Sequence, residues 1–459
     1  MSDDYAIYAN RRVLVIGLGR SGVAACTLLK EKGAQVVATD LRSRYELDAN
    51  ALAVAADLDE LVLTSHPPEL IHDVDLIVLS PGVLLTLPLL VEARRRSIPI
   101  WSELELGFRH VSGTVVAVTG TKGKSTTATL MRDMLTASGR EARLAGNIGA
   151  PLAAELAGAT EQTFFVVEVS SFQLETIDSF RPHVAVLLDV SPDHLDWHPT
   201  FDDYVRAKAR IFKNQRRDDW AVVYGGNPLT VTMASKGKSR KLYFDLDCLG
   251  EKYPHVHREG PWIVWHDDGE TTPLASLEEL TVPGEHNRVN AMAASAAAAL
   301  LGLSGEALEE AFEQFEGLPH ALERVAEIGG VRFYNDSKAT NIQAVRAALE
   351  SFDAPVVLIL GGRFKGGDFR DLRTAATRRV KRVLAIGESR DQVKAALEDV
   401  ATVDVCDDLE SAVEKAHASA VPGDVVLLSP AGSSFDMFKD YRERGERFRE
   451  IVHRLATGS

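Results

Sequence analysis

The chain has 459 residues, enough for about three domains with large hydrophobic cores. Its formal net charge of −15 disfavours a nonspecific grip on nucleic acid or anionic lipid, so a phosphorylated ligand needs a local positive site. The three cysteines, Cys26, Cys248 and Cys406, are too widely spaced for a zinc finger or a disulfide framework, as is typical of a reducing cytosol. No apolar run approaches the length of about 18 residues that a membrane span needs, and the acidic start does not resemble a secretory signal.

Short runs rich in Val, Ile and Leu alternate with helical stretches along the chain. Near-continuous apolar strands separated by helices predict an α/β fold whose parallel sheets are covered on both faces. We expect these strands at residues 13–16, 36–38, 76–79, 115–118, 164–169, 184–188, 356–360, 383–386 and 425–428.

Polar, turn-rich segments near residues 110–114 and 315–320 predict two domain boundaries. The segment from about 225 to 275 is rich in polar residues, Gly and Pro and has short alternating runs, so we expect a small antiparallel excursion from the middle domain. The predicted domains are residues 1–112, 113–317 and 318–459.

The first candidate site is the glycine loop Gly17-Leu-Gly19-Arg-Ser-Gly22, which follows the first expected strand. A helix and a second strand ending at Asp40 come next, which matches the dinucleotide-binding fingerprint of a phosphate at a helix N-terminus and an acidic residue on a ribose. The alternative is a tight turn without a nucleotide. The loop at residues 79–83 follows another strand and falls on the same sheet edge.

A second glycine loop, Gly120-Thr-Lys-Gly123-Lys124-Ser125-Thr126, joins the strand at 115–118 to a helix. Backbone N–H groups, the helix dipole and Lys124 favour phosphate, and the Ser125 hydroxyl suits Mg²⁺. Because Val118 stands where a standard P-loop has its first glycine, this is a shortened variant. It predicts binding of a nucleoside triphosphate.

Carboxylate and imidazole side chains follow the next two strands. Glu168 ends one strand, and Asp193 and His194 lie shortly after the other. Beside a phosphate loop, such groups at strand ends can hold a hard cation that bridges phosphates. Individually, such residues are more often helix caps or surface charges, but their shared position at consecutive strand ends favours the metal site.

Lys208 stands in the middle of an apolar helical stripe, Tyr204-Val-Arg-Ala-Lys208-Ala-Arg-Ile-Phe212. One interpretation is that its amine snorkels to the helix edge. The other is a desolvated lysine, which loses its proton more readily and can be modified covalently or act as a base. The spacing does not decide between them.

Three polar loops at strand ends mark the last third of the chain, at residues 335–341, 361–366 and 429–436. Their lysines and hydroxyl groups predict a site for a small anionic substrate. Ordinary caps and turns are the alternative.

Taken in order, these motifs resemble the ATP-dependent Mur ligase family of peptidoglycan precursor synthesis over essentially the whole chain. The string Asn335-Asp-Ser-Lys-Ala-Thr-Asn341 resembles the D-glutamate-adding members, because sibling ligases resemble Asp-Tyr-Ala-His or Asp-Tyr-Asn-Ala there. The other matching sequence motifs are the Gly17 loop, Ser80-Pro-Gly82, Thr119–Ser125, Gly146–Gly149, Glu168–Glu175, Asp193–Asp196, Gly284–Asn290 and Gly317–His320.

The resemblance implies a Rossmann-like first domain that holds the uridine diphosphate of the substrate, with no nicotinamide. It implies a central P-loop ATPase-like domain and a Rossmann-like third domain that takes the amino acid. The residues implied for the UDP-substrate are Gly19, Arg20, Ser21, Asp40, Ser80, Pro81, Gly82, Asn147, Ser170 and Gln173.

For ATP, the resemblance implies contacts from the phosphate loop, from the middle domain and from the third domain. Ser125 and Glu168 are implied for one Mg²⁺, and His194 with a carbamylated Lys208 for a second, so that Lys124, His194 and Lys208 form the catalytic set. The implied ATP residues are Gly120, Thr121, Lys122, Gly123, Lys124, Ser125, Thr126, Asn147, Asn287, Asn290, Asp336 and Lys338, and those for D-glutamate are Thr340, Lys365, Ser434 and Tyr441.

The implied activity is ATP-dependent addition of D-glutamate to UDP-N-acetylmuramoyl-L-alanine through an acyl phosphate, by a cytoplasmic monomer without nucleic-acid or membrane partners. The chain departs from the family pattern at Ala321, where Arg usually follows Leu-Pro-His, and at Leu41, Asp189 and the Gly-Arg-Phe-Lys365 run. A catalytically silent ATP-binding relative and a sibling ligase therefore stay open. A nicotinamide-dependent dehydrogenase would leave the second glycine loop and the third domain without a role.

Overall fold

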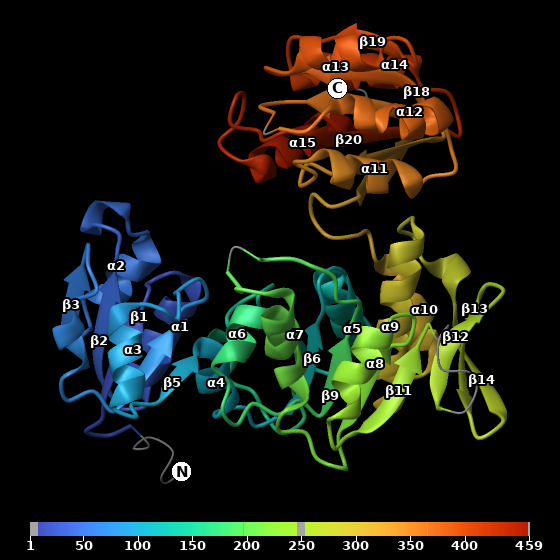
Figure 1. Cartoon of the computed structure of the whole chain (residues 1–459). Helices are drawn as coiled ribbons and strands as arrows, with labels where there is room; N and C mark the ends of the chain where they lie inside the picture. Colours follow the sequence, from blue (N-terminus) through green and yellow to red (C-terminus); the bar gives the residue numbers. More distant parts are fainter. Residues whose placement is uncertain (1–7, 196, 246–252, 365, 458–459) are drawn as a thin grey trace. The chain divides into compact units, whose positions relative to one another are not determined.

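A computed structural model describes residues 8–195, 197–245, 253–364 and 366–457, and Figure 1 shows their elements in chain order. Three separate sheets with flanking helices confirm the predicted α/β class with three domains. By their internal contacts the residues form two compact units, one holding the first two sheets and Val289–Ala311, the other holding Glu278–Arg288 and the chain from Phe312 on. The boundaries at 112/113 and 317/318 stay predictions.

The first sheet is parallel, in the order β3-β2-β1-β4-β5. Its strands are apolar on both faces, because α1, α2 and α4 pack on one face and α3 with the turn Pro68–Ile71 packs on the other. The elements are β1 (Arg12–Ile16), α1 (Arg20–Glu31), β2 (Gln35–Asp40), α2 (Ala49–Ala55), β3 (Glu60–Leu63), β4 (Leu76–Leu79), α3 (Pro88–Arg95), β5 (Ile100–Ser102) and α4 (Glu103–Phe108).

The second sheet has the order β14-β13-β12-β11-β10-β9-β6-β8-β7 and is parallel from β7 to β12. Its elements are β6 (Thr114–Thr119), α5 (Lys124–Ala137), β7 (Ala142–Gly146), β8 (Phe164–Glu168), α6 (Ser171–Glu175), β9 (Val184–Leu187), α7 (Phe201–Ala209), η5 (Arg210–Phe212), β10 (Trp220–Tyr224), α8 (Pro228–Ser235), β11 (Arg240–Phe244), β12 (His255–Glu259), β13 (Trp262–Asp267), β14 (Glu270–Ser276), α9 (Glu285–Leu300) and α10 (Gly305–Gln314).

The predicted antiparallel excursion at about 225–275 is only partly correct. Strands β12 to β14 are antiparallel, but residues before them form α8 and the parallel strand β11. The prediction failed there because α8 has little amphipathic contrast and β11 begins with two basic residues, so neither has a clear period. The hairpins extend the main sheet rather than leaving it.

The third sheet has the order β15-β16-β20-β17-β18-β19, with only β15 antiparallel. Helices α11, α12 and α13 pack on one face, and α14 and α15 pack on the other. The elements are β15 (Glu323–Ile328), β16 (Val331–Asn335), α11 (Ile342–Glu350), β17 (Val356–Gly361), α12 (Arg373–Arg379), β18 (Val380–Ile386), α13 (Arg390–Leu397), β19 (Thr402–Val405), α14 (Leu409–Ser419), β20 (Val425–Ala431) and α15 (Tyr441–Thr457).

Every strand that its apolar run predicted is present, within a few residues of the expected ends. The short edge strands β3, β7 and β19 were not predicted, and neither was the interior strand β10, although its sequence Trp-Ala-Val-Val-Tyr is an apolar run. In the part of the chain that is described, no helix has both the length and the apolar character needed to cross a bilayer.

The first glycine loop depends on close packing at Gly22. A Cβ at this position would stand 1.8 Å from the Gly17 carbonyl oxygen and 2.8 Å from Ser80 Oγ, whereas a Cβ at Gly19 would meet nothing within 4 Å.

We therefore expect Gly22→Ala to destabilise the protein by about 2 kcal/mol or more, although Ala is intrinsically the better helix former by about 1 kcal/mol. Gly19→Ala is the matched control and should leave stability nearly unchanged. Thermal unfolding followed by scanning calorimetry measures both, and equal melting temperatures for the two variants would contradict this account of the loop.

Candidate active site

The carboxyl ends of β1, β2 and β4 meet at one edge of the first sheet, and the predicted loops lie there. Ser80 Oγ donates to the Gly17 carbonyl at 2.8 Å, so the two loops are joined. Gly19 begins α1 without a side-chain cap, which leaves N–H groups of the first turn for a ligand. Pro81 and Gly82 continue the Ser80 loop.

Asp40 anchors this edge. Its carboxylate accepts from Leu18 N at 2.7 Å and takes two hydrogen bonds from the Arg42 guanidinium, at 2.9 and 3.0 Å. Burial by itself raises the pKa of Asp40, but the hydrogen bonds from Arg42 and Leu18 outweigh it and lower the pKa to about 2. Asp40, which was predicted to contact a ribose, is thus an ionised carboxylate that also holds the glycine loop in place.

Arg20 and Ser21 lie in the first turn of α1. Arg20 donates to the carbonyl of Gly149 in the loop after β7, a contact that links the first two domains within their common unit. Its guanidinium is therefore partly engaged and still exposed at the loop edge.

The second glycine loop joins β6 to α5 as predicted, and both of its glycines have positive φ angles, +154° at Gly120 and +81° at Gly123. Helix α5 begins at Lys124 without a side-chain cap, so its first N–H groups point to a ligand position. Lys124 Nζ donates to the Thr121 carbonyl at 2.9 Å, and Lys122 is exposed. This is the geometry of a phosphate-binding loop.

Glu168 lies at the end of β8, buried beside the start of α5. Its two oxygens accept from Ser125 Oγ at 2.6 Å and from Asn147 Nδ2 at 2.7 Å. The structure thus brings these three predicted residues together. A hydroxyl and a carboxylate are oxygen donors of the kind that Mg²⁺ prefers, so this pair fits the first predicted ion.

Lys208 is buried, with 2% of its surface exposed, and its Nζ donates to the Gly120 carbonyl at 2.7 Å. Burial, and next the positive charge of Lys124, lower the pKa of Lys208 to about 7. The snorkelling interpretation is therefore wrong, because the amine points inward to the phosphate loop. An ammonium cannot ligate a metal, whereas the carbamate that is predicted for Lys208 would offer an anionic oxygen to the second ion.

The sequence reasoning treated Tyr204 as no more than an apolar neighbour of Lys208. Its ring lies 4.7 Å from Lys208 Nζ, and its hydroxyl lies 3.0 Å from Thr121 Oγ1. The residue therefore connects α7 to the phosphate loop. Its position four residues before Lys208, on the same helical face, was the signal that could have found it.

His194 lies in the loop between β9 and α7, half exposed, with its ring centroid 5.0 Å from that of Phe172. Its positive φ angle and its position 3.7 Å from the Asp193 carboxylate do not by themselves make a metal site. Within the described ranges, no three His, Cys, Asp or Glu side chains are arranged around a possible metal ion. Metal binding here therefore depends also on the Ser125 hydroxyl, a modified Lys208 or the phosphates of the ligand.

Ser170 and Gln173 have a local structural role at the start of α6. The Ser170 hydroxyl accepts from Gln173 N, and Gln173 Oε1 accepts from Ser170 N at 3.0 Å, forming a capping box. Asn290, on α9, places Oδ1 against the phosphate loop, 2.2 Å from where a Cβ of Gly123 would stand.

The remaining predicted residues belong to the second unit. Asp336 is buried, accepts from Ser429 Oγ at 2.7 Å and from Leu322 N at 3.2 Å, and burial raises its pKa to about 7. Asn287 donates to the Pro283 carbonyl at 2.7 Å. Lys338 is exposed, Thr340 and Tyr441 are half-buried, Ser434 is buried, and Lys365 lies outside the described residues.

Arg444 on α15 is a residue that the sequence reasoning missed. It is buried and donates to Ser337 Oγ and the Ser337 carbonyl at 2.9 and 2.8 Å, and to the Gly432 carbonyl at 3.1 Å. One guanidinium thus joins the loops after β16 and β20, which carry predicted substrate residues. Its helical spacing from the buried Phe448 and Ile451 was the available signal.

Three family models match the chain in sequence order. The Mur ligase MurD-like N-terminal domain matches residues 11–102, the Mur ligase middle domain matches 118–298, and the Mur ligase glutamate ligase domain matches 322–432. The chain belongs to the Mur ligase family.

Curated relatives agree with this assignment. The chain is 40% identical over 449 residues to the UDP-N-acetylmuramoylalanine–D-glutamate ligase of Acidobacterium capsulatum, covering 97% of each chain. It is 42% identical over 451 residues to the protein of that name from Desulfosudis oleivorans, covering 98% of this chain and 97% of the relative. A structure of MurF from Acinetobacter baumannii aligns with a TM-score of 0.59 at 19% identity, covering 98% of this chain and 93% of MurF, which supports the fold alone.

Lys208 predicts a pH-dependent stability in CO₂-free buffer. The pKa of Lys208 is lower in the folded protein than in the unfolded chain. Between these two pKa values the unfolded chain holds the proton and the folded protein does not, so native stability falls as the pH drops toward 7. We expect Lys208→Met to be more stable than the unmodified protein by roughly 1–4 kcal/mol at pH 7, since one pH unit corresponds to about 1.4 kcal/mol.

Urea unfolding at pH 7 and at pH 9.5 measures this effect. The advantage of Lys208→Met should shrink at the higher pH, and an advantage that stays constant or grows would contradict the proposed titration. Lys213→Met, with a partly exposed lysine on the following turn, is the control and should give no such trend.

Proposed function

We propose that this protein is an ATP-dependent ligase that adds D-glutamate to UDP-N-acetylmuramoyl-L-alanine in peptidoglycan precursor synthesis. The observation that carries the proposal is the full-length similarity, near 40% identity, to relatives named for this reaction. The joined arrangement of the phosphate loop, Glu168 and Lys208 supports it, because these are the groups that such a phosphoryl transfer needs.

In the first step, an oxygen of the substrate's L-alanyl carboxylate attacks the γ-phosphorus of ATP. An acyl phosphate forms and ADP leaves. Two anions must approach each other, so Lys124 and the N–H groups at the start of α5 lower the barrier by stabilising the phosphate charge. Gly120 and Gly123 let the backbone come close enough to do so.

In the second step, the uncharged amine of D-glutamate attacks the acyl carbon. A tetrahedral intermediate forms, inorganic phosphate leaves with the bonding electrons, and the nitrogen loses a proton to give the amide. The protein contributes mainly position and charge stabilisation. We assign binding of D-glutamate to Thr340, Ser434, Tyr441 and Lys365, the last of which would oppose a carboxylate.

The other assignments follow the same division of the chain. ATP contacts come from Gly120 to Thr126, Asn147, Asn287 and Asn290, and from Asp336 and Lys338. UDP-substrate contacts come from Gly19 to Ser21, Asp40, Ser80 to Gly82, Asn147, Ser170 and Gln173. We further propose that the enzyme works as a monomer in the cytoplasm.

We propose two Mg²⁺ ions, which when bound would offset negative charge on the ATP phosphates. Ser125 and Glu168 would hold one, and His194 with the carbamate of Lys208 would hold the other. Carbamate formation needs an uncharged amine, and the lowered pKa of Lys208 supplies one near neutral pH. The amine attacks CO₂ and releases one proton, so a buried cation becomes an anion.

Ala321 favours a second candidate, a catalytically silent relative that binds ATP without turning it over. Its backbone N–H donates to the Leu318 carbonyl in a turn where His320 and Leu322 have positive φ angles. Its methyl group cannot contact a phosphate as an arginine could.

The first experiment incubates the protein with ATP, Mg²⁺ and UDP-N-acetylmuramoyl-L-alanine, and measures phosphate release with D-glutamate, L-glutamate or no amino acid. We expect release that requires D-glutamate, with a product heavier by one glutamyl residue in mass spectrometry. Lys124→Ala should lower turnover by about 10² or more, because it removes charge stabilisation at the phosphates. ATP binding without release under any condition would favour the silent relative.

The carbamate has its own test. In buffer depleted of CO₂ we expect turnover to fall, by about tenfold or more, and bicarbonate should restore it. With ¹³C-labelled bicarbonate, a carbamate carbonyl signal should appear in the NMR spectrum and be absent from Lys208→Ala. Lys415→Ala, which removes an exposed lysine of α14, should keep the signal. Full turnover without CO₂ would overturn the assignment.

A further inference from the structure

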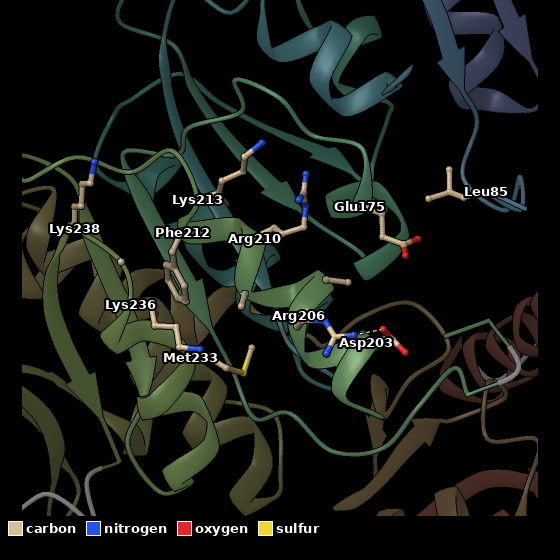
Figure 2. A pocket seen from close by; sticks show the side chains of 13 residues that line it. Leu85, Glu175, Asp203, Arg206, Arg210, Phe212, Lys213, Met233, Lys236 and Lys238 are labelled. Atoms are coloured by element: carbon tan, nitrogen blue, oxygen red, sulfur yellow. Dashed lines mark hydrogen bonds and ion pairs between the residues drawn. The ribbon is translucent and has the colours of Figure 1, made fainter. Parts of the chain in front are cut away.

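A groove lined by the second domain, with Leu85 from the first domain at its edge, carries more basic than acidic side chains. It encloses about 650 Å³ between the segment α7–η5 and the loop that joins α8 to β11. Figure 2 labels the basic side chains that line it, which are Arg206, Arg210, Lys213, Lys236 and Lys238.

The two acidic residues of the groove are already engaged. Asp203 pairs with Arg206, as the dashed line in Figure 2 marks. Glu175 accepts from Trp197 Nε1 at 3.2 Å and lies 3.8 Å from His198 Nδ1. Among the described residues, no ion pair joins a carboxylate to the other four cations, Arg210, Lys213, Lys236 and Lys238, although the charge of Glu175 acts on Arg210.

Two of these cations are held in place by uncharged partners. Arg210 donates to the carbonyls of Leu174 and Ile177 at 2.6 and 2.8 Å, and Lys213 Nζ lies 3.4 Å from the Ile177 carbonyl oxygen. Burial lowers the pKa of Arg210, and the negative charge of Glu175 opposes this shift without reversing it. A ligand anion would compensate for this loss of solvation.

The opposite wall is also preorganised. Lys241 Nζ donates to the carbonyls of Gly237 and Ser239 at 2.6 and 2.5 Å, which fixes the loop that carries Lys236 and Lys238. Gly237 packs closely on η5, because a Cβ there would stand 3.2 Å from Phe212 Cβ. The two exposed lysines therefore need no backbone rearrangement to face a ligand, which lowers the cost of binding.

We propose that this groove is a second anion site that takes a small phosphate-bearing molecule. Lysine ammonium groups are compact charges that bind phosphate oxygens, and Lys236 and Lys238 are exposed to do so. The volume is that of a site for a small molecule, and the net charge of −15 on the chain disfavours an extended polyanion or an anionic lipid surface. The site is separate from the phosphate loop, since none of its lining residues belongs to residues 120–126.

Inorganic pyrophosphate, without Mg²⁺, is the probe for this site. In calorimetric titration of the full chain we expect the Lys236→Ala/Lys238→Ala double variant to show one binding event fewer than the unmodified protein. Lys394→Ala/Lys415→Ala removes two exposed lysines from α13 and α14 and is the matched control, which should keep every event. Equal stoichiometry and affinity in all three proteins would overturn the proposal.

A chemical footprint locates the site without any variant. At a pyrophosphate concentration ten times its Kd, acetylation of Lys236 and Lys238 should slow about tenfold, while Lys394 and Lys415 react at an unchanged rate. Equal rates with and without pyrophosphate at the first pair would overturn the proposal. Both readouts are independent of turnover, so failure of the ligase assay leaves them interpretable.

Discussion

The phosphate loop after β6 has its shape because two of its residues have no side chain. A methyl on Gly120 would stand 2.6 Å from Leu188 Cβ, and one on Gly123 would stand 2.2 Å from Asn290 Oδ1. The loop is therefore wedged between the end of β9 and helix α9. In this position the Gly120 carbonyl accepts from Lys208 Nζ, so the geometry of the candidate site depends on this close packing.

The same packing concentrates positive charge. Lys124 and Lys208 approach one loop from different helices. The buried carboxylate of Glu168, whose charge raises the pKa of Lys208, also accepts hydrogen bonds from Ser125 and Asn147. A buried ammonium at this position lowers native stability, a cost that proteins accept at functional sites. Phosphate binding and modification of the lysine would both reduce the excess charge, which links stability of the site to its proposed chemistry.

The other two domains fix their loops by different means. In the first domain, the Asp40 carboxylate holds the glycine loop by accepting from Leu18 N. In the third, the buried Arg444 guanidinium joins two loops by donating to Ser337 and to the Gly432 carbonyl. Each is one ionised side chain that makes several charge-assisted hydrogen bonds, and such bonds position a loop more firmly than neutral ones. Polar residues that flank a candidate site therefore also serve as its scaffold.

Much of the fold could be predicted from local sequence. Buried parallel strands such as β1, β6 and β17 are continuous apolar runs. The glycine loops after β1 and β6 are short motifs that can be recognised from a few consecutive residues. Edge strands such as β7 and β19 could not be predicted in this way, because they are only partly buried and therefore contain both polar and apolar residues.

The sequence by itself determined the family, the order of the three sheets and the residue types at the phosphate loop, because these depend on contiguous patterns. Only the tertiary structure decided that Lys208 points inward to Gly120, that Tyr204 contacts Thr121 and that Arg444 is buried beneath two loops. A helical stripe gives the face on which a side chain lies, but not what packs against that face. The direction of a long polar side chain is set by contacts between residues distant in sequence, and these exist only after the chain has folded.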